Sequence, residues 1–114
     1  MLVCSLRVAS MADYTLIDDL TREIQVTGDQ VMNRTILRNN RAKIELLALA
    51  SGQELSTHAA PAPAIVQILQ GEARFTVASD EQELSPGSWL YMEANVWHAV
   101  YARTDVIMLV TILS

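Results

Sequence analysis

Residues 58–75 read HAAPAPAIVQILQGEARF, a mostly apolar stretch that contains a single glycine, Gly71. After this glycine, residues 72–77 place Glu, Arg and Thr on one side of an extended chain and Ala, Phe and Val on the other. A period of two is typical of a β-strand with one face in the core and the other in water. Before the glycine, the same period puts positions 64, 66 and 68 on one face. We therefore predict strands around a turn at Gly71, and residues 72–77 are the clearest strand of the chain.

Turn-forming residues divide the rest of the chain into segments of similar length. Turns are expected at Gly28-Asp29, Asn39-Asn40, Ser51-Gly52, Ser79-Asp80 and Pro86-Gly87. Residues 31–38 and 42–50 are rich in aliphatic side chains and are predicted to form a hairpin. Residues 15–24 are the one helical candidate, and a short one. The sequence thus predicts an all-β domain of about eight strands, closed as a jelly-roll β-barrel, with at most one short N-terminal helix.

Length and charge limit the classes of function. A chain of 114 residues with 51% apolar residues is long enough for one packed domain and too short for two. A net charge of −5 argues against nucleic acid or an anionic membrane as a partner. The single cysteine, Cys4, excludes an internal disulfide and fits a reducing compartment. No apolar stretch has the length of a signal peptide or a membrane span, so we expect a cytoplasmic protein.

The two ends of the chain differ in character. Met11 resembles an alternative start, so residues 1–12 are expected to be an extension or arm, and residues 13–114 the barrel domain. Residues 106–113 are almost continuously apolar, which indicates a strand that is covered on both faces. The barrel interior would cover one face and a second subunit the other. We therefore predict a homodimer.

Both histidines of the chain stand where they can converge inside a barrel. His58 follows the turn at Gly52, and His98 begins the expected strand 98–103. Alternation groups His98 with Val100 and Ala102, the smaller and more apolar face, so His98 should point inward. A lone inward histidine is more often a hydrogen-bonded core residue than a ligand, but two that converge favour a site.

The surroundings of these histidines resemble the two sequence motifs of the cupins. The first motif has a Gly, five residues, a His-x-His pair, a Glu, six residues and a closing Gly. This chain has Gly52, His58, Ala60, Ala64 and Gly71 at the named positions of that motif. The spacing is kept, although the second His and the Glu are replaced by alanine.

The second cupin motif has a Gly, five residues, Pro-x-Gly, two residues and a His. This chain has Gly87, Glu93, Asn95 and His98 at those positions, again with the spacing kept. Asn95 replaces a glycine in a turn, where asparagine tolerates positive φ better than other non-glycine residues. With the flanking strands the two motifs cover residues 42–113, so the resemblance implies a small single-domain cupin, an RmlC-like jelly roll with a degenerate metal motif.

The resemblance also implies a site. In cupin enzymes similar to this chain, three His and one Glu hold a divalent metal. The resemblance assigns ligand roles in this chain to His58 and His98 alone. Two imidazoles are fewer protein ligands than typical zinc or iron sites use. Gln67 or Glu93 could add an oxygen ligand, but alternation places Gln67 on the face opposite position 64. No cofactor is certain, and a divalent transition metal is the candidate.

Several functions fit this composition. The bulky residues Trp89, Tyr91, Met92 and Trp97 are expected to line an apolar cavity mouth, although alternation prevents all four from facing it. One hypothesis is a barrel that binds a small, largely apolar ligand, with His58 and His98 as polar anchors or as acid and base. The alternative is a metal-dependent oxygenase, isomerase or lyase with the same histidines as ligands. A third is a dimeric module without ligand. No motif of serine hydrolases, phosphate loops, zinc proteases or EF-hands occurs.

Overall fold

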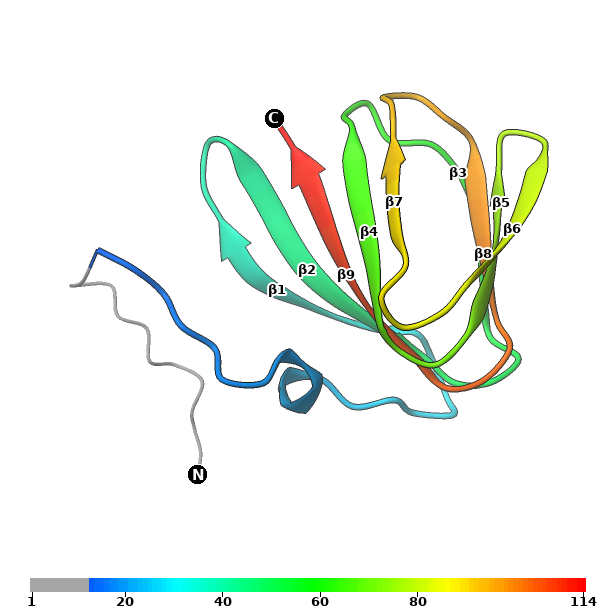
Figure 1. Ribbon diagram of the computed structural model, residues 1–114, viewed down its shortest axis with the longest axis horizontal. Coiled ribbons are helices and arrows are strands. Elements are labelled where there is room, and N and C mark those ends of the chain that lie inside the picture. The colour runs from blue at the N-terminus through cyan, green and yellow to red at the C-terminus, as the bar shows by residue number, and fades with distance from the viewer. Residues whose placement is uncertain (1–12) are drawn as a thin grey trace.

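The computed structural model describes residues 13–114, which fold into nine β-strands arranged in two antiparallel sheets (Figure 1). The strands are β1 (Met32–Arg38), β2 (Ala42–Leu49), β3 (Glu54–His58), β4 (Ala64–Gln70), β5 (Ala73–Val77), β6 (Asp80–Leu84), β7 (Trp89–Met92), β8 (His98–Ala102) and β9 (Val106–Leu113). One sheet has the order β1-β2-β9-β4-β7 and the other the order β3-β8-β5-β6. The chain passes back and forth between the sheets, as in a jelly roll. The predicted all-β fold is confirmed.

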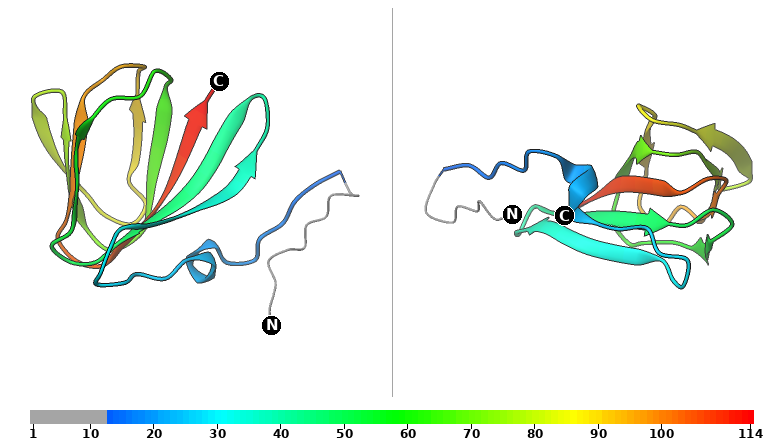
Figure 2. Two further views of the ribbon diagram at one scale, coloured as in Figure 1. Left: turned by 180° about the vertical axis from the view of Figure 1, so that it is seen from behind. Right: turned by 90° about the horizontal axis from the view of Figure 1, so that it is seen from below.

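The β1–β2 hairpin forms where the sequence predicts it. The Asn39 side chain closes the turn, because its Oδ1 accepts hydrogen bonds from the backbone N–H groups of Arg41 and Ala42, at 2.8 and 3.0 Å. Beyond the turn the two strands pair in antiparallel register from Arg38↔Lys43 to Met32↔Ala48, with one irregularity near Leu37. The hairpin forms one edge of the five-stranded sheet (Figure 2).

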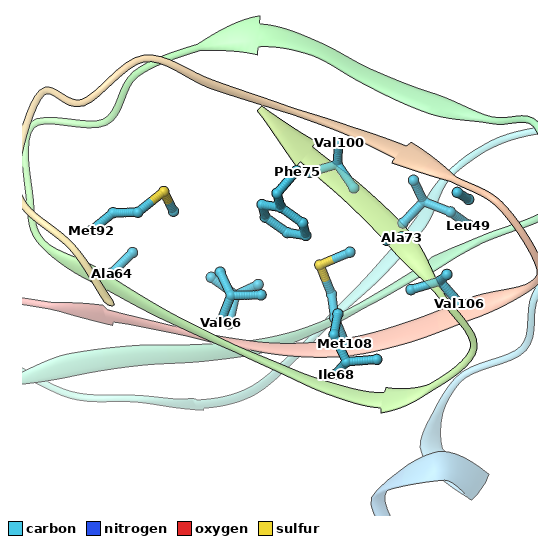
Figure 3. Close-up of a cluster of buried hydrophobic side chains, with 12 residues drawn as sticks. Leu49, Ala64, Val66, Ile68, Ala73, Phe75, Met92, Val100, Val106 and Met108 are labelled. Atoms are coloured by element: carbon cyan, nitrogen blue, oxygen red, sulfur yellow. The ribbon is translucent and has the colours of Figure 1, made fainter. Parts of the chain in front are cut away.

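The inner faces of the two sheets form one apolar core. Phe75 and Val100 lie on one side of this core and Val66 and Met108 on the other (Figure 3). Phe75 is 1% exposed, and burying a phenylalanine side chain stabilises a fold by about 1.5 to 3 kcal/mol. The alternation predicted for β5 and for positions 64, 66 and 68 of β4 is confirmed, because the inward residues of both strands are buried except Val77, which is partly buried against the core.

The segment before β1 covers part of the outer face of the larger sheet. Leu20, Ile24 and Val26 pack against a small cluster that contains Leu46 and Ile107. The helix predicted over 15–24 is wrong in extent: the structure has a 3₁₀-helix, η1 (Leu20–Glu23), of four residues. Asp19 caps it, accepting from the backbone N–H of Thr21. So short a helix gains little from its own hydrogen bonds, and the packing of its apolar residues on the sheet holds it.

Strand β9 has the bounds that its apolar sequence predicts. Val106, Met108 and Val110 face the core, and Ile107 is buried on the outer face, whereas Leu109 is only partly buried there. The homodimer stays a prediction. The predicted arm, residues 1–12, and Cys4 lie outside the described residues, and within residues 13–114 no helix is long and apolar enough to cross a membrane.

Two glycines with similar backbone conformations allow a matched test of the fold. Gly71 (φ 82°) lies so close to Asp105 that an added Cβ would collide with the Asp105 carbonyl oxygen, whereas an added Cβ at Gly52 (φ 89°) would meet nothing within 4 Å. Gly52→Ala should cost about 1–2 kcal/mol through backbone strain alone. Gly71→Ala should cost about 3 kcal/mol or more, because the turns around β4–β5 and β8–β9 must move apart. Urea unfolding of both variants measures the difference in stability. Equal losses of stability would contradict the close approach of Gly71 to Asp105.

Candidate functional site

A cavity of about 110 Å³ lies between the two sheets, at the end of the barrel where β3 ends and β8 begins. Its wall is mostly apolar and includes Leu55, Val66, Phe75, Met92, Val100 and Met108. Three wall residues are ionisable: Glu45, His58 and His98. An engineered apolar cavity of about 150 Å³ holds benzene, so this cavity suits the body of a slightly smaller molecule.

The two histidines are direct neighbours. His58 and His98 are Cα partners in the β3–β8 pairing, and their ring centroids lie 4.2 Å apart with the ring planes at 62°. The predicted convergence of the two rings therefore agrees with the structure, with His98 partly buried and His58 exposed at the end of the barrel.

An irregularity in β3 directs His58 into the cavity. Between the pairs Leu55↔Val100 and His58↔His98, β3 contains one residue more than β8. In a regular strand, residues three apart such as Leu55 and His58 face opposite sides, yet both line this cavity. An extra residue of this kind is a β-bulge, which re-aims the side chains that follow it. Alternation alone could not have predicted the orientation of His58.

Both imidazole rings are held in the same way by the backbone. His58 Nδ1 lies 2.8 Å from the Ser56 carbonyl oxygen, and His98 Nδ1 lies 3.0 Å from the Val96 carbonyl oxygen. A carbonyl oxygen only accepts, so Nδ1 carries the proton and donates in each ring. In the neutral form Nε2 then keeps its lone pair. The site therefore offers two adjacent imidazole acceptors.

The environment favours the neutral form of His98. Burial in the apolar wall lowers the pKa of His98, the hydrogen bond to the Val96 carbonyl acts in the opposite direction, and the proximity of His58 lowers the pKa further. His98 is thus uncharged at neutral pH and acts there as an acceptor rather than as a cation.

Glu45 is a site residue that sequence reasoning missed. It lies on β2, in the sheet opposite to the histidines, and its side chain is 13% exposed. Its partner among residues 13–114 is Lys43, whose Nζ lies 3.7 Å from Oε1. The signal was present in the sequence, since Glu45 is the one charged residue within the apolar run 44–50.

The ligand set of a cupin metal site does not fit these residues. Ala60 and Ala64 both line the cavity, so the two positions that lack a ligand side chain are part of its wall. Within the described part of the chain, no group of three or more His, Cys, Asp or Glu side chains is arranged to hold a metal ion. Glu45 is therefore not positioned as a third ligand beside the two histidines.

The two oxygen ligands considered from the sequence do not line this cavity. Gln67 pairs with Trp89 and Leu109 and lies on the outer face of its sheet, as alternation from Ala64 predicts. Glu93 is exposed and accepts a hydrogen bond from the Tyr91 hydroxyl at 3.4 Å. Asn95 has φ 67° in the turn before β8, which agrees with the expectation for this position.

Of the four bulky residues expected at the cavity mouth, the structure places Met92 on the wall. Met92 is 5% exposed, whereas Trp89 and Trp97 are each 60% exposed and Tyr91 is 40% exposed. Trp89 and Tyr91 lie on the outer face of β7 because they alternate with the inward residues. Trp97 lies in the loop between β7 and β8. These three side chains do not line the cavity.

The lowered pKa of His98 predicts a pH dependence of stability. The folded pKa lies below the ordinary value of 6.5, so the unfolded chain binds the proton more readily than the folded chain. The contribution of His98 is therefore complete above pH 6.5 and is lost as the pH falls through the folded pKa. NMR titration should give His98 a pKa below 6.5. The free energy of unfolding, measured with urea, should fall more on acidification for the wild type than for His98→Asn. Parallel curves for the two proteins would contradict the assignment.

Comparison with known proteins agrees with this architecture. The family model described as the cupin domain matches residues 45–113. A conserved protein of unknown function from Streptococcus pyogenes is 30% identical, with 90% of each chain covered and a TM-score of 0.80. A cupin superfamily protein from Desulfitobacterium hafniense is 26% identical, with 90% of this chain and 92% of that chain covered and a TM-score of 0.79.

More distant similarities concern the fold alone. A DMSP lyase from Ruegeria pomeroyi is 20% identical, with 75% of this chain and 48% of that chain covered and a TM-score of 0.72. No curated protein matches the sequence. The family model spans more than half of the chain, and both barrel motifs fall within it. The chain therefore belongs to the cupin domain family.

Proposed function

We propose that this cupin binds a small organic ligand with a largely apolar body inside the barrel, with His58 and His98 as its polar anchors. The observation that carries the proposal is the pair of imidazoles, 4.2 Å apart, on the wall of an otherwise mostly apolar cavity. Apolar walls with a few convergent polar groups are the usual composition of small-molecule sites, in which the polar groups fix the orientation of the ligand.

The hydrogen bonds of the histidines support a role as acceptors. Each Nδ1 is used by a backbone carbonyl, which fixes the ring orientation and leaves Nε2 for a ligand. Because the pKa of His98 is lowered by burial, its ring accepts rather than donates at neutral pH. A ligand hydroxyl or amino group would therefore donate to Nε2. The same arrangement would let His98 act as a general base towards a bound substrate.

A metal-dependent enzyme is the second candidate. Metal-ligating histidines commonly donate their other ring N–H to a backbone carbonyl, and both histidines here do so. Two imidazoles alone are fewer ligands than catalytic zinc or iron sites use. The organic-ligand function is favoured because the two remaining family ligand positions are alanines on the cavity wall.

Filling the cavity should abolish binding. Ala60 lines the cavity, whereas Ala62 is similarly half-buried nearby but does not. We expect cyclopentanol to bind the wild type and Ala62→Phe, and to lose measurable affinity for Ala60→Phe, as followed by NMR shift changes of cavity amides. Similar binding by both phenylalanine variants would place the ligand elsewhere.

The role of the histidines as anchors is tested within the same experiment. Cyclopentanol and cyclopentane differ by one hydroxyl group. The wild type should prefer the alcohol, and His58→Ala combined with His98→Ala should weaken alcohol binding by about 2- to 10-fold per lost hydrogen bond. The affinity for cyclopentane should change little. If neither probe binds the wild type, the proposal fails.

A further inference from the structure

The cavity contains a carboxylate that the anchoring role of the histidines leaves unexplained. Glu45 lies on the wall opposite His58 and His98, in register with apolar neighbours: it pairs with Val110, which pairs in turn with Val66. The side chain is 13% exposed. A carboxylate in such surroundings is unfavourable unless a cation or hydrogen-bond donors compensate it.

The negative charge of the Glu45 carboxylate is only partly compensated by other residues of the protein. Lys43 stands two residues earlier on the same strand and therefore on the same face, with its side chain 36% exposed. Its Nζ lies 3.7 Å from Glu45 Oε1, whereas a charge-assisted N–H···O bond is about 2.7–2.9 Å long. The carboxylate thus keeps acceptor capacity that a ligand in the cavity can use.

The ionisable groups of the wall share one chemical character. Each imidazole directs Nδ1 to a backbone carbonyl and leaves Nε2 for a ligand, and the carboxylate oxygens of Glu45 are acceptors. A purely apolar ligand would remove water from the Glu45 carboxylate without offering it a hydrogen-bond donor. An anionic ligand would meet the negative charge of Glu45. A protonated amine brings three donors and the opposite charge.

We propose that the ligand is a small primary amine, whose ammonium group pairs with Glu45 while its apolar body lies against the wall. This inference rests on the proposed function, because it assigns a ligand class to the same cavity. Lys43 then acts as an internal competitor for Glu45, since its own ammonium group lies beside the carboxylate. Removing Glu45 and removing Lys43 should therefore change amine affinity in opposite directions.

The test uses three probes that share a carbon chain: n-butylamine, n-butanol and butyrate, each titrated into the full chain near neutral pH and followed by NMR. The wild type should bind the amine about tenfold or more tightly than the alcohol, because the ammonium group makes a charge-assisted hydrogen bond to Glu45 that the alcohol does not make. Butyrate should bind most weakly. The probes are alike in size, so differences in affinity report the head group.

Two variants assign this preference to Glu45. Glu45→Gln keeps the shape and should remove the preference for the amine, with butanol affinity unchanged within about twofold. Lys43→Met should tighten amine binding several-fold and leave butanol unaffected. Unchanged amide spectra and urea midpoints of the free variants show that each one is folded. Arg22→Met is the control for loss of a positive charge, because the Arg22 side chain is 83% exposed and belongs to η1, away from the cavity.

The outcomes separate the two proposals. If butanol binds but the amine binds no better, or if Glu45→Gln keeps the preference, the amine assignment is overturned while the organic-ligand function stands. Tightest binding of butyrate also overturns it and points to Lys43 instead. If none of the three probes binds, both proposals fail together.

Discussion

Strand β9 is the element on which the larger sheet and the cavity depend. It pairs along its whole length with β2 on one side and along most of its length with β4 on the other. Neither neighbour is adjacent to it in sequence, so the sheet closes only when the C-terminal strand enters between them. Its inward residues Met108, Val110 and Ile112 all line the cavity. The same pairing aligns Glu45 with Val110 and Ala64 with Ile112, so the strand that completes the fold also sets the positions of the site residues.

The second sheet supplies the other half of the site through a local irregularity rather than through regular pairing. The β-bulge before His58 turns this side chain towards His98, and backbone carbonyls then fix both rings. The same cavity is lined by the alanines at the two other family ligand positions and, on the opposite sheet, by the carboxylate of Glu45. The family scaffold is thus retained while the chemistry of its interior changes. Alanine in place of histidine and glutamate enlarges the cavity and removes two metal-ligating side chains. Glu45 adds a negative charge at another part of the cavity wall. We regard this exchange as the basis of an organic-ligand site.

The fold was largely predictable from the sequence because it is encoded by spacing and alternation, which survive the loss of individual ligands. Motif spacing identified His58 and His98, and alternation correctly assigned Gln67 to the outer face. The site was less predictable for physical reasons that can be named. A bulge cannot be read from a period of two, and Glu45 lies outside both motifs, in a strand whose inward face depends on the register with β9. The bulk of Trp89 and Trp97 suggested a place at the cavity mouth, but both side chains are 60% exposed. Bulk alone does not predict burial, because much of a protein surface is apolar.

The central claim is that Ala60 and Ala64 have replaced a metal site by an organic-ligand cavity. Its most direct test is the metal content of the purified protein, without added metal or chelator, beside the double variant Ala60→His with Ala64→Glu. Since both alanines line the cavity with His58 and His98, the variant would bring four donors together. The account predicts far less than one metal per chain in the wild type and close to one in the variant. Close to one metal per chain in the wild type, lost in His98→Ala, would contradict it.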